Sequence, residues 1–179
     1  MHKKLHVAII LFVILPVLIF LPACSKKTTE TEASDAAMQQ EDMEAQRVRE
    51  QLEQERKAKG REFRAEKIKF MYEDIYFKKG SYKLTPEARE LLKGKARWLQ
   101  KNSDLKVIVE GHTDEAGSKE YNLALGDRRA GAVKSFLIGQ GVESGRLIAV
   151  SYGNEQPIST GSKETTRAKN RRVHFVVEE

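Results

Sequence analysis

Residues 107–114 read VIVEGHTD, and this stretch decides the fold of the C-terminal part of the chain. Apolar side chains recur at every second position from Leu105 to Val109, while Lys106 and Glu110 lie on the opposite face. Alternation with a period of two is typical of a half-buried strand. The pattern therefore predicts a strand over residues 105–111, followed by a polar loop that carries Asp114.

Helical and strand-like segments alternate on both sides of this strand. Thr85 followed by Pro86 is a strong helix start, because a capping hydroxyl precedes a proline at the first helical position. Asn102 predicts the end of that helix, and Gly141 lies just beyond the end of a second one. The expected elements are strands at 74–77, 105–111, 146–152 and 172–177, helices at 85–102 and 119–138, and a short helix before the last strand. This order, β-α-β-α-β-(α)-β, predicts an α/β sandwich with helices packed on a mixed sheet.

The N-terminus predicts a targeting segment. Lys3 and Lys4 precede the continuous apolar run 7–21, which is 15 residues long and contains Pro16. A membrane-spanning helix needs about 20 apolar residues, so the run is short for a permanent span. A basic start followed by a short apolar run is typical of a secretory signal peptide, predicted here over residues 1–23. An uncleaved N-terminal membrane anchor is the alternative.

Cys24 is the single cysteine of the chain and directly follows this segment in the sequence LPAC. A lone cysteine in a secreted chain cannot form an internal disulfide and calls for another explanation. The tetrapeptide resembles a bacterial lipobox, which implies a diacylated Cys24 as the mature N-terminus; the alternative is a free thiol. Ser25 stands where an aspartate would retain a lipoprotein in the inner membrane. The resemblance thus implies an outer-membrane lipoprotein that faces the periplasm.

Residues 24–69 are predicted to be a charged linker between the lipid anchor and a domain at 70–179. Ser25–Lys69 contains 11 basic and 11 acidic residues, so its charges balance. The part up to Gln40 is rich in small polar residues and is expected to be disordered. The part from Glu41 is rich in helix formers and is expected to be partly helical. Its apolar spacing is too short to predict a coiled coil.

Charge and motif content argue against two other classes of protein. Removing residues 1–23 lowers the net charge from +6 to +4, a small surplus for a nucleic-acid-binding protein. The sequence has neither a Gly-x-Ser-x-Gly nor a His-Glu-x-x-His motif, and its one cysteine lies in the lipobox. His112 and Asp114 without further ligands are a weak metal site. We therefore expect no catalytic residues, no metal and no cofactor.

Four motifs in a fixed order resemble the OmpA-like C-terminal domain. They are VIVEGHTD at 107–114, YNLALGDRRAGAV at 121–133, VSYG at 150–153 and NRRV at 170–173. The resemblance covers about 110 of the 179 residues. It implies that the domain binds peptidoglycan through the diaminopimelate of the stem peptide, a zwitterion with extra carboxylates.

The resemblance also implies which residues bind this ligand. The family's acid, which binds the ligand ammonium, falls on Asp114, and its arginine, which binds a carboxylate, falls on Arg129. A guanidinium can bind a carboxylate with two parallel hydrogen bonds, which a lysine cannot. The other implied binding residues are Asn122, Thr113, Leu125 and Phe77. In the alternative without a binding role, the Asp114 carboxylate would cap the following turn and Arg129 would be a solvated arginine of the helix.

One position departs from the family pattern. Many relatives have an aspartate directly after the Phe77 position, and this chain has Lys78. A lysine there would repel the ligand ammonium or meet a carboxylate, so a single acid is expected at the amine end.

The combined anchor and domain resemble lipid-anchored members of the family that tie the outer membrane to the wall and work with the Tol proteins. That resemblance implies TolB as a partner. An OmpA-like lipoprotein that anchors a different envelope or secretion assembly is the alternative. Stator proteins and porins of the same superfamily are disfavoured, because residues 1–70 contain no long membrane span or run of barrel strands.

Overall fold

The computed structural model describes residues 29–178. The predicted signal peptide and Cys24 therefore lie outside the described residues. The chain divides into two compact units, residues 1–52 and 53–179. The described residues of the first unit all belong to helix α1 (Thr29–Tyr72), and the fold of the second unit carries the predicted site.

Helix α1 is longer than the sequence analysis expected. It begins at Thr29, so the disorder expected up to Gln40 is not found from that residue onward. Alanine, glutamate, glutamine and methionine in this stretch are good helix formers. Farther along, Lys57 pairs with Glu53 at 2.7 Å and Lys59 with Glu55 at 2.8 Å, both one helical turn apart.

The second unit is built on a mixed four-stranded sheet in the order β1-β4-β2-β3. The strands are β1 (Ile75–Tyr76), β2 (Lys106–His112), β3 (Leu147–Gly153) and β4 (Arg172–Glu178). Strand β4 is antiparallel to both β1 and β2, whereas β3 is parallel to β2. All four strands lie within about a residue of their predicted positions, and the mixed sheet with helices packed on it is confirmed.

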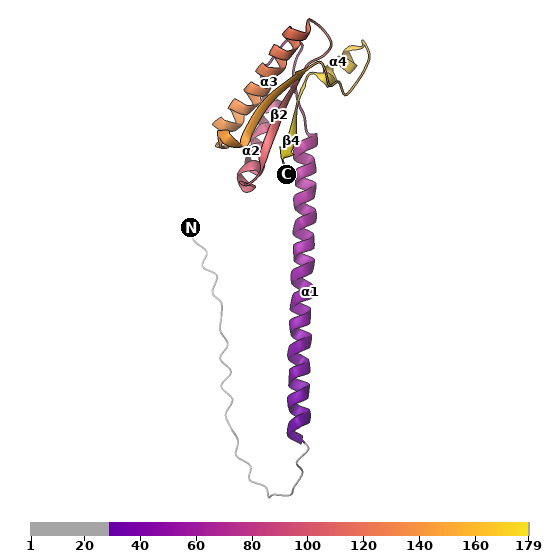
Figure 1. The fold of residues 1–179 in the computed structure, drawn as a ribbon, viewed down its shortest axis with the longest axis vertical. Helices are drawn as coiled ribbons and strands as arrows, with labels where there is room; N and C mark the ends of the chain where they lie inside the picture. The colour runs from indigo at the N-terminus through magenta and orange to yellow at the C-terminus, as the bar shows by residue number, and fades with distance from the viewer. Residues whose placement is uncertain (1–28, 179) are drawn as a thin grey trace, which may run out of the picture. The chain divides into compact units, whose positions relative to one another are not determined.

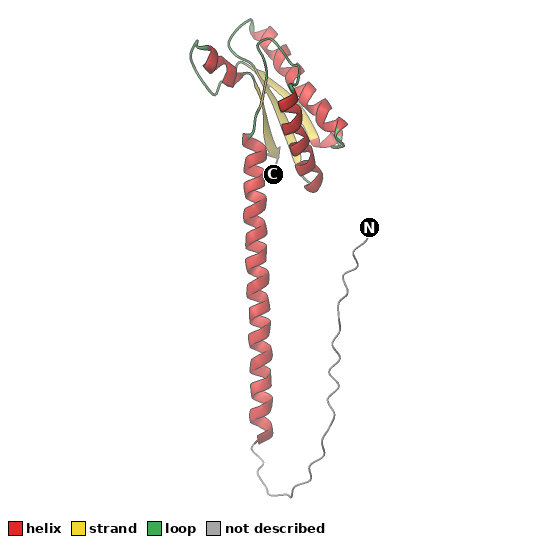
Figure 2. Ribbon diagram, turned by 180° about the vertical axis from the view of Figure 1, so that it is seen from behind, coloured by secondary structure: helices red, strands yellow, loops and turns green. Residues whose placement is uncertain are grey.

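Two long helices, α2 (Pro86–Lys101) and α3 (Lys119–Gly139), pack against this sheet, and Figure 2 shows them from the helix side. The predicted start of α2 is confirmed, since Thr85 Oγ1 accepts a hydrogen bond from the Ala88 amide at 3.2 Å. A short 3-10 helix (Ser144–Arg146) precedes β3, and α4 (Glu164–Asn170) precedes β4 (Figure 1).

The core lies between the sheet and the helices. Its fully buried side chains come from every second residue of the strands and from one face of each helix. They include Ile75, Leu92, Leu99, Val107, Val109, Val133, Leu137, Val173 and Phe175. Burying aliphatic or aromatic side chains of this size contributes roughly 1.5–3 kcal/mol each, which makes this layer the main source of stability.

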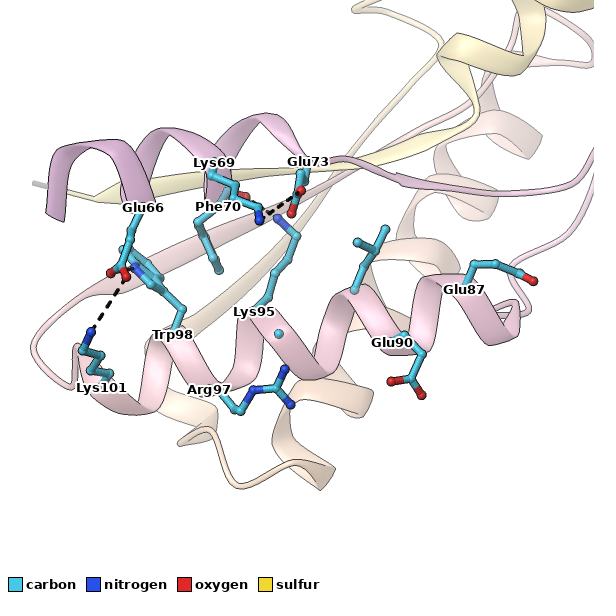
Figure 3. A pocket seen from close by; sticks show the side chains of 12 residues that line it. Glu66, Lys69, Phe70, Glu73, Glu87, Glu90, Lys95, Arg97, Trp98 and Lys101 are labelled. Atoms are coloured by element: carbon cyan, nitrogen blue, oxygen red, sulfur yellow. Dashed lines mark hydrogen bonds and ion pairs between the residues drawn. The ribbon is translucent and has the colours of Figure 1, made fainter. Parts of the chain in front are cut away.

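The last turns of α1 belong to this core. The Phe70 ring stacks on Trp98 of α2 at a centroid distance of 4.5 Å and lies 5.4 Å from the Phe175 ring of β4. The predicted domain boundary at residue 70 thus falls inside a helix whose end is part of the packed domain. A groove of about 920 Å³ runs between this end of α1 and α2 (Figure 3).

A buried lysine fastens α1 to α2 beside this groove. The Lys95 ammonium donates a hydrogen bond to the Phe70 carbonyl, near the C-terminus of α1, where the helix dipole favours a cation. It also lies 4.6 Å from the centre of the Phe70 ring and 4.3 Å from that of Phe175. Figure 3 shows its side chain reaching from α2 toward Phe70. Burial lowers the pKa of Lys95 to about 8, although Glu73 and Asp74 oppose this shift.

Candidate functional site

The predicted site residues gather at one edge of the sheet. Strand β2 ends at His112 and the antiparallel β4 begins at Arg172, so the loop after β2 and the segment before β4 meet there. The end of β1 reaches the same edge, because the Phe77 amide donates to the Arg171 carbonyl at 2.9 Å. The mixed topology therefore brings residues near 77, 114 and 171 together from distant parts of the chain.

Asp114 is nearly buried, with 6% of its surface exposed. Its Oδ2 accepts a hydrogen bond from Arg171 Nη1 at 3.0 Å. Its Oδ1 accepts, from the part of the chain that the structure describes, only a long hydrogen bond, which the Ala116 amide donates at 3.4 Å. One oxygen of the carboxylate is therefore firmly held, and the other has only a weak protein partner.

Arg129 projects from α3 and has no exposed surface. Its Nε donates to the Ser81 carbonyl at 2.9 Å, its Nη1 to the His112 carbonyl at 2.7 Å and its Nη2 to the Lys78 carbonyl at 3.3 Å. Burial lowers the pKa of Arg129 to about 10, and the charge of Asp114 opposes this shift. The guanidinium therefore joins the loop after β1 to the end of β2.

Of the other four predicted binding residues, Phe77 and Thr113 contact Arg129 and Asp114, whereas Asn122 and Leu125 lie on the buried face of α3 that carries Arg129. The Phe77 ring centre lies 5.2 Å from the Arg129 guanidinium carbon, and Thr113 donates its hydroxyl to the Asp114 carbonyl at 3.1 Å. Leu125 is 7% exposed, one helical turn before Arg129. Asn122 is fully buried, and neither Oδ1 nor Nδ2 of its amide has a hydrogen-bond partner within residues 29–178. Buried amides are nearly always hydrogen-bonded, so Asn122 is an exception at the site.

The site also contains two residues that the sequence analysis did not single out. Arg171 takes the role of ion-pair partner to Asp114, and Glu164 of α4 accepts from Arg171 Nη2 at 2.6 Å. The signal for Arg171 was present, since it belongs to the motif at 170–173 and directly precedes a strand. Arg128, the neighbour of Arg129, is exposed and lies over the Tyr82 ring at 5.9 Å.

Within residues 29–178, no cluster of three or more histidine, cysteine, aspartate or glutamate side chains is arranged to hold a metal ion. Among the same residues, no helix combines the length and the apolar character that crossing a bilayer requires.

A protein-family model described as the OmpA family matches residues 76–171, which contain the whole site. The chain belongs to the OmpA family. This membership confirms the resemblance of the four ordered motifs and the α/β fold with helices on a mixed sheet.

Similar proteins within the OmpA family carry one recurring name. The chain is 48% identical over 102 residues to the peptidoglycan-associated lipoprotein of Haemophilus influenzae, covering 57% of this chain and 67% of that protein. It is 51% identical over 101 residues to the protein of the same name from Pseudomonas aeruginosa, covering 56% of this chain and 60% of the relative. The similarity to lipid-anchored OmpA family members is thus confirmed, and it spans about two thirds of their length or less.

Solved structures agree with this assignment. The crystal structure of the peptidoglycan-associated lipoprotein from Burkholderia pseudomallei matches with a TM-score of 0.57 at 38% identity, covering 59% of this chain and 89% of that one. The C-terminal domain of Helicobacter pylori MotB matches with a TM-score of 0.57 at 26% identity, covering 60% and 84% of the two chains. The OmpA family domain therefore occurs both in lipoproteins and in MotB proteins.

Proposed function

We propose that this chain is an outer-membrane lipoprotein that binds peptidoglycan without covalent attachment and thereby ties the membrane to the wall. The observation that carries the proposal is a nearly buried acid, Asp114, beside two buried arginines at one edge of an OmpA family domain. The names of its relatives, which are called peptidoglycan-associated lipoproteins, support the same ligand.

The charges of the site suit a zwitterionic ligand such as diaminopimelate. Asp114 Oδ1, with its single long hydrogen bond, is available to a ligand ammonium. A guanidinium has five N–H donors, and Arg129 uses three nitrogens for carbonyls, so one N–H on each Nη remains for a ligand carboxylate. Because Arg129 has no exposed surface, the side chains that cover it must move before a ligand reaches it. Phe77, Thr113, Asn122 and Leu125 would complete the same binding site.

The N-terminal segments would supply the other end of the tether. In this proposal Cys24 carries the acyl chains, which anchor a protein stably when two or more are present. Helix α1 has 44 residues and is therefore about 66 Å long. In this proposal α1 belongs to the linker between the lipid anchor and the wall-binding domain. We further propose a non-catalytic role in a Tol-type system with TolB as a partner.

Co-sedimentation with purified peptidoglycan sacculi tests the wall-binding claim. The full chain carrying Asp114→Asn should lose most of its co-sedimentation while the domain remains folded, as circular dichroism would show. Asp127→Asn is the matched control, because Asp127 is an exposed acid of α3 outside the site. Undiminished binding by Asp114→Asn would show that Asp114 is not a binding residue. If the unmodified chain does not bind sacculi, the proposed function is wrong.

Two further measurements test the remaining claims. Cys24→Ser should release the protein from the outer-membrane fraction of cells. Purified TolB should be retained by the immobilised chain; if it is not, the lipoprotein anchors a different envelope assembly to the wall.

A further inference from the structure

Arg171 connects three parts of the site. It is the residue between α4 and β4, and each of its three side-chain nitrogens has a different acceptor. Its Nη1 donates to Asp114 Oδ2 at 3.0 Å, its Nη2 to Glu164 Oε1 at 2.6 Å and its Nε to the Phe77 carbonyl at 3.3 Å. Only 7% of the Arg171 side chain is exposed. Such an arginine is fixed in place and fixes its partners in turn.

This arrangement determines which oxygen of Asp114 a ligand can use. Oδ2 is occupied by a charge-assisted hydrogen bond, whereas Oδ1 has only the long contact with the Ala116 amide. Charge-assisted hydrogen bonds are about twice as strong as neutral ones, so Oδ2 is the held oxygen. The carboxylate is thus oriented with Oδ1 as the acceptor for an incoming cation.

Glu164 changes the charge balance of the same cluster. Asp114 alone would be neutralised by Arg171, leaving nothing to balance a ligand ammonium. With Glu164 the three side chains carry one net negative charge, and Arg129 adds one positive charge nearby. This combination complements one ammonium and one carboxylate. Glu164 therefore acts, through Arg171, as a second acid at the ammonium of the ligand. It does so although position 78, where many relatives have an aspartate, is a lysine here.

We propose that Arg171 is the positioning residue of the ammonium subsite and that Glu164, acting through Arg171, supplies the second acid of that subsite. This inference rests on the proposed peptidoglycan-binding function. Arg171 holds Asp114 in the orientation that presents Oδ1, and Glu164 leaves the cluster with one unbalanced negative charge. Because the Glu164 side chain is 64% exposed, its contribution is weaker than that of Arg171.

Calorimetric titration of the full chain in detergent tests this assignment with two ligands. The first is a stem tetrapeptide with the free side-chain amine of diaminopimelate, and the second is the same peptide with that amine acetylated. Arg171→Lys should bind the free-amine peptide about tenfold more weakly, since a charge-assisted hydrogen bond contributes about a factor of ten or more. Glu164→Gln should lose about threefold. Both variants should bind the acetylated peptide as the unmodified chain does.

The double variant Asp114→Asn with Arg171→Lys separates positioning from general stabilisation. If Arg171 acts through Asp114, the double variant should bind no more weakly than Asp114→Asn alone. Arg97→Gln is the control, because Arg97 is an exposed arginine of α2 outside the site. It should bind both peptides normally.

Three results would overturn the proposal. One is an equal loss by Arg171→Lys on both peptides, and another is additive loss in the double variant, since each indicates a purely structural arginine. The third is an unchanged affinity of Glu164→Gln for the free-amine peptide, and this result alone decides if Arg171→Lys does not fold. If the unmodified chain binds neither peptide nor sacculi, the proposed function itself fails.

Discussion

Asp114 forms its ion pair with Arg171, 57 positions away in the sequence, and not with Arg129. The topology explains this pairing, because Gly111 of β2 lies opposite Val173 of β4 in the antiparallel register. The residues just beyond each, Asp114 and Arg171, therefore meet at the same edge of the sheet. Arg129 instead bonds to backbone carbonyls, so the two arginines of the site have separate tasks.

Arg129→Lys should lower the free energy of unfolding by about 2–4 kcal/mol, because one ammonium cannot serve three buried carbonyls in fixed directions. Sacculus binding should fall with it. Chemical denaturation of the full chain measures the loss. Arg128→Lys is the control; this exposed neighbour should change stability by less than about 0.5 kcal/mol. Equal stability of both variants would contradict the role given to Arg129.

Lys78→Asp should strengthen binding of a free-amine stem peptide by a few-fold, since an exposed ion pair contributes about 0.2–1 kcal/mol. The fold should be unaffected, because Arg129 contacts the backbone carbonyl of residue 78 and not its side chain. The gain should shrink as salt is added. Lys79→Asp provides the neighbouring control. A weaker affinity of Lys78→Asp would indicate that Lys78 meets a ligand carboxylate.

Lys95→Met should remove a pH dependence of stability at alkaline pH. Burial lowers the pKa of Lys95 from 10.5 to about 8, so the unfolded chain binds more protons than the folded one between these values. The free energy of unfolding of the unmodified chain should therefore rise across that window, by up to about 3 kcal/mol. In Lys95→Met this rise should be absent.

Denaturation curves from pH 7 to 10.5 check the Lys95 prediction. Lys93→Met serves as the control, because Lys93 lies on the same helix with 44% of its side chain exposed and pairs with Glu90. If the Lys95 and Lys93 variants show the same pH dependence, the ammonium of Lys95 is not the group that titrates.

His112→Phe should protect the fold at acidic pH. The His112 ring is 1% exposed, and neither nitrogen has a hydrogen-bond partner among the described residues. Burial, together with the charges of Arg172 and His174, lowers its pKa from 6.5 to about 4. The unfolded chain therefore binds more protons between pH 4 and 6.5, and stability falls as the pH drops through this window.

Phenylalanine keeps the ring that stacks on Tyr152 at 5.7 Å but cannot bind a proton. The stability curve of His112→Phe should therefore lie above that of the unmodified chain at pH 4 by up to about 3 kcal/mol, and the difference should narrow toward pH 7. A constant difference over the whole range would contradict this explanation.

The sequence was sufficient to predict the strands and helices of the domain. Strand alternation at 105–109 and the Thr85–Pro86 start are local signals, and both are found in the structure at the expected places. Helix α1 begins at Thr29, within the stretch for which the sequence predicts disorder. This stretch contains threonine and serine, which favour disorder, but also alanine, glutamate, glutamine and methionine, which are good helix formers.

The geometry of the site was harder to predict. Which arginine pairs with Asp114 depends on the register between β2 and β4, and no local pattern carries that register. The burial of Arg129 depends on hydrogen bonds to three backbone carbonyls. Every residue has such a carbonyl, so the sequence does not show which ones accept from Arg129. Lys95 was likewise missed, because a lysine within a charged helix gives no sign that it lies between two aromatic rings.

Helix α3 and strand β2 face each other through two glycines, Gly126 of α3 and Gly111 of β2. A Cβ atom on Gly111 would stand 1.9 Å from the Gly126 carbonyl oxygen, so neither a side chain nor a water separates the two backbones there. The separation between Arg129 on the helix and the end of β2 is consequently set by main-chain contact and does not vary with side-chain rotamers. Even an alanine at position 111 would push the helix outward and lengthen the bond from Arg129 to the His112 carbonyl. The width of the candidate site is thus fixed by two residues that have no side chain, Gly111 and Gly126.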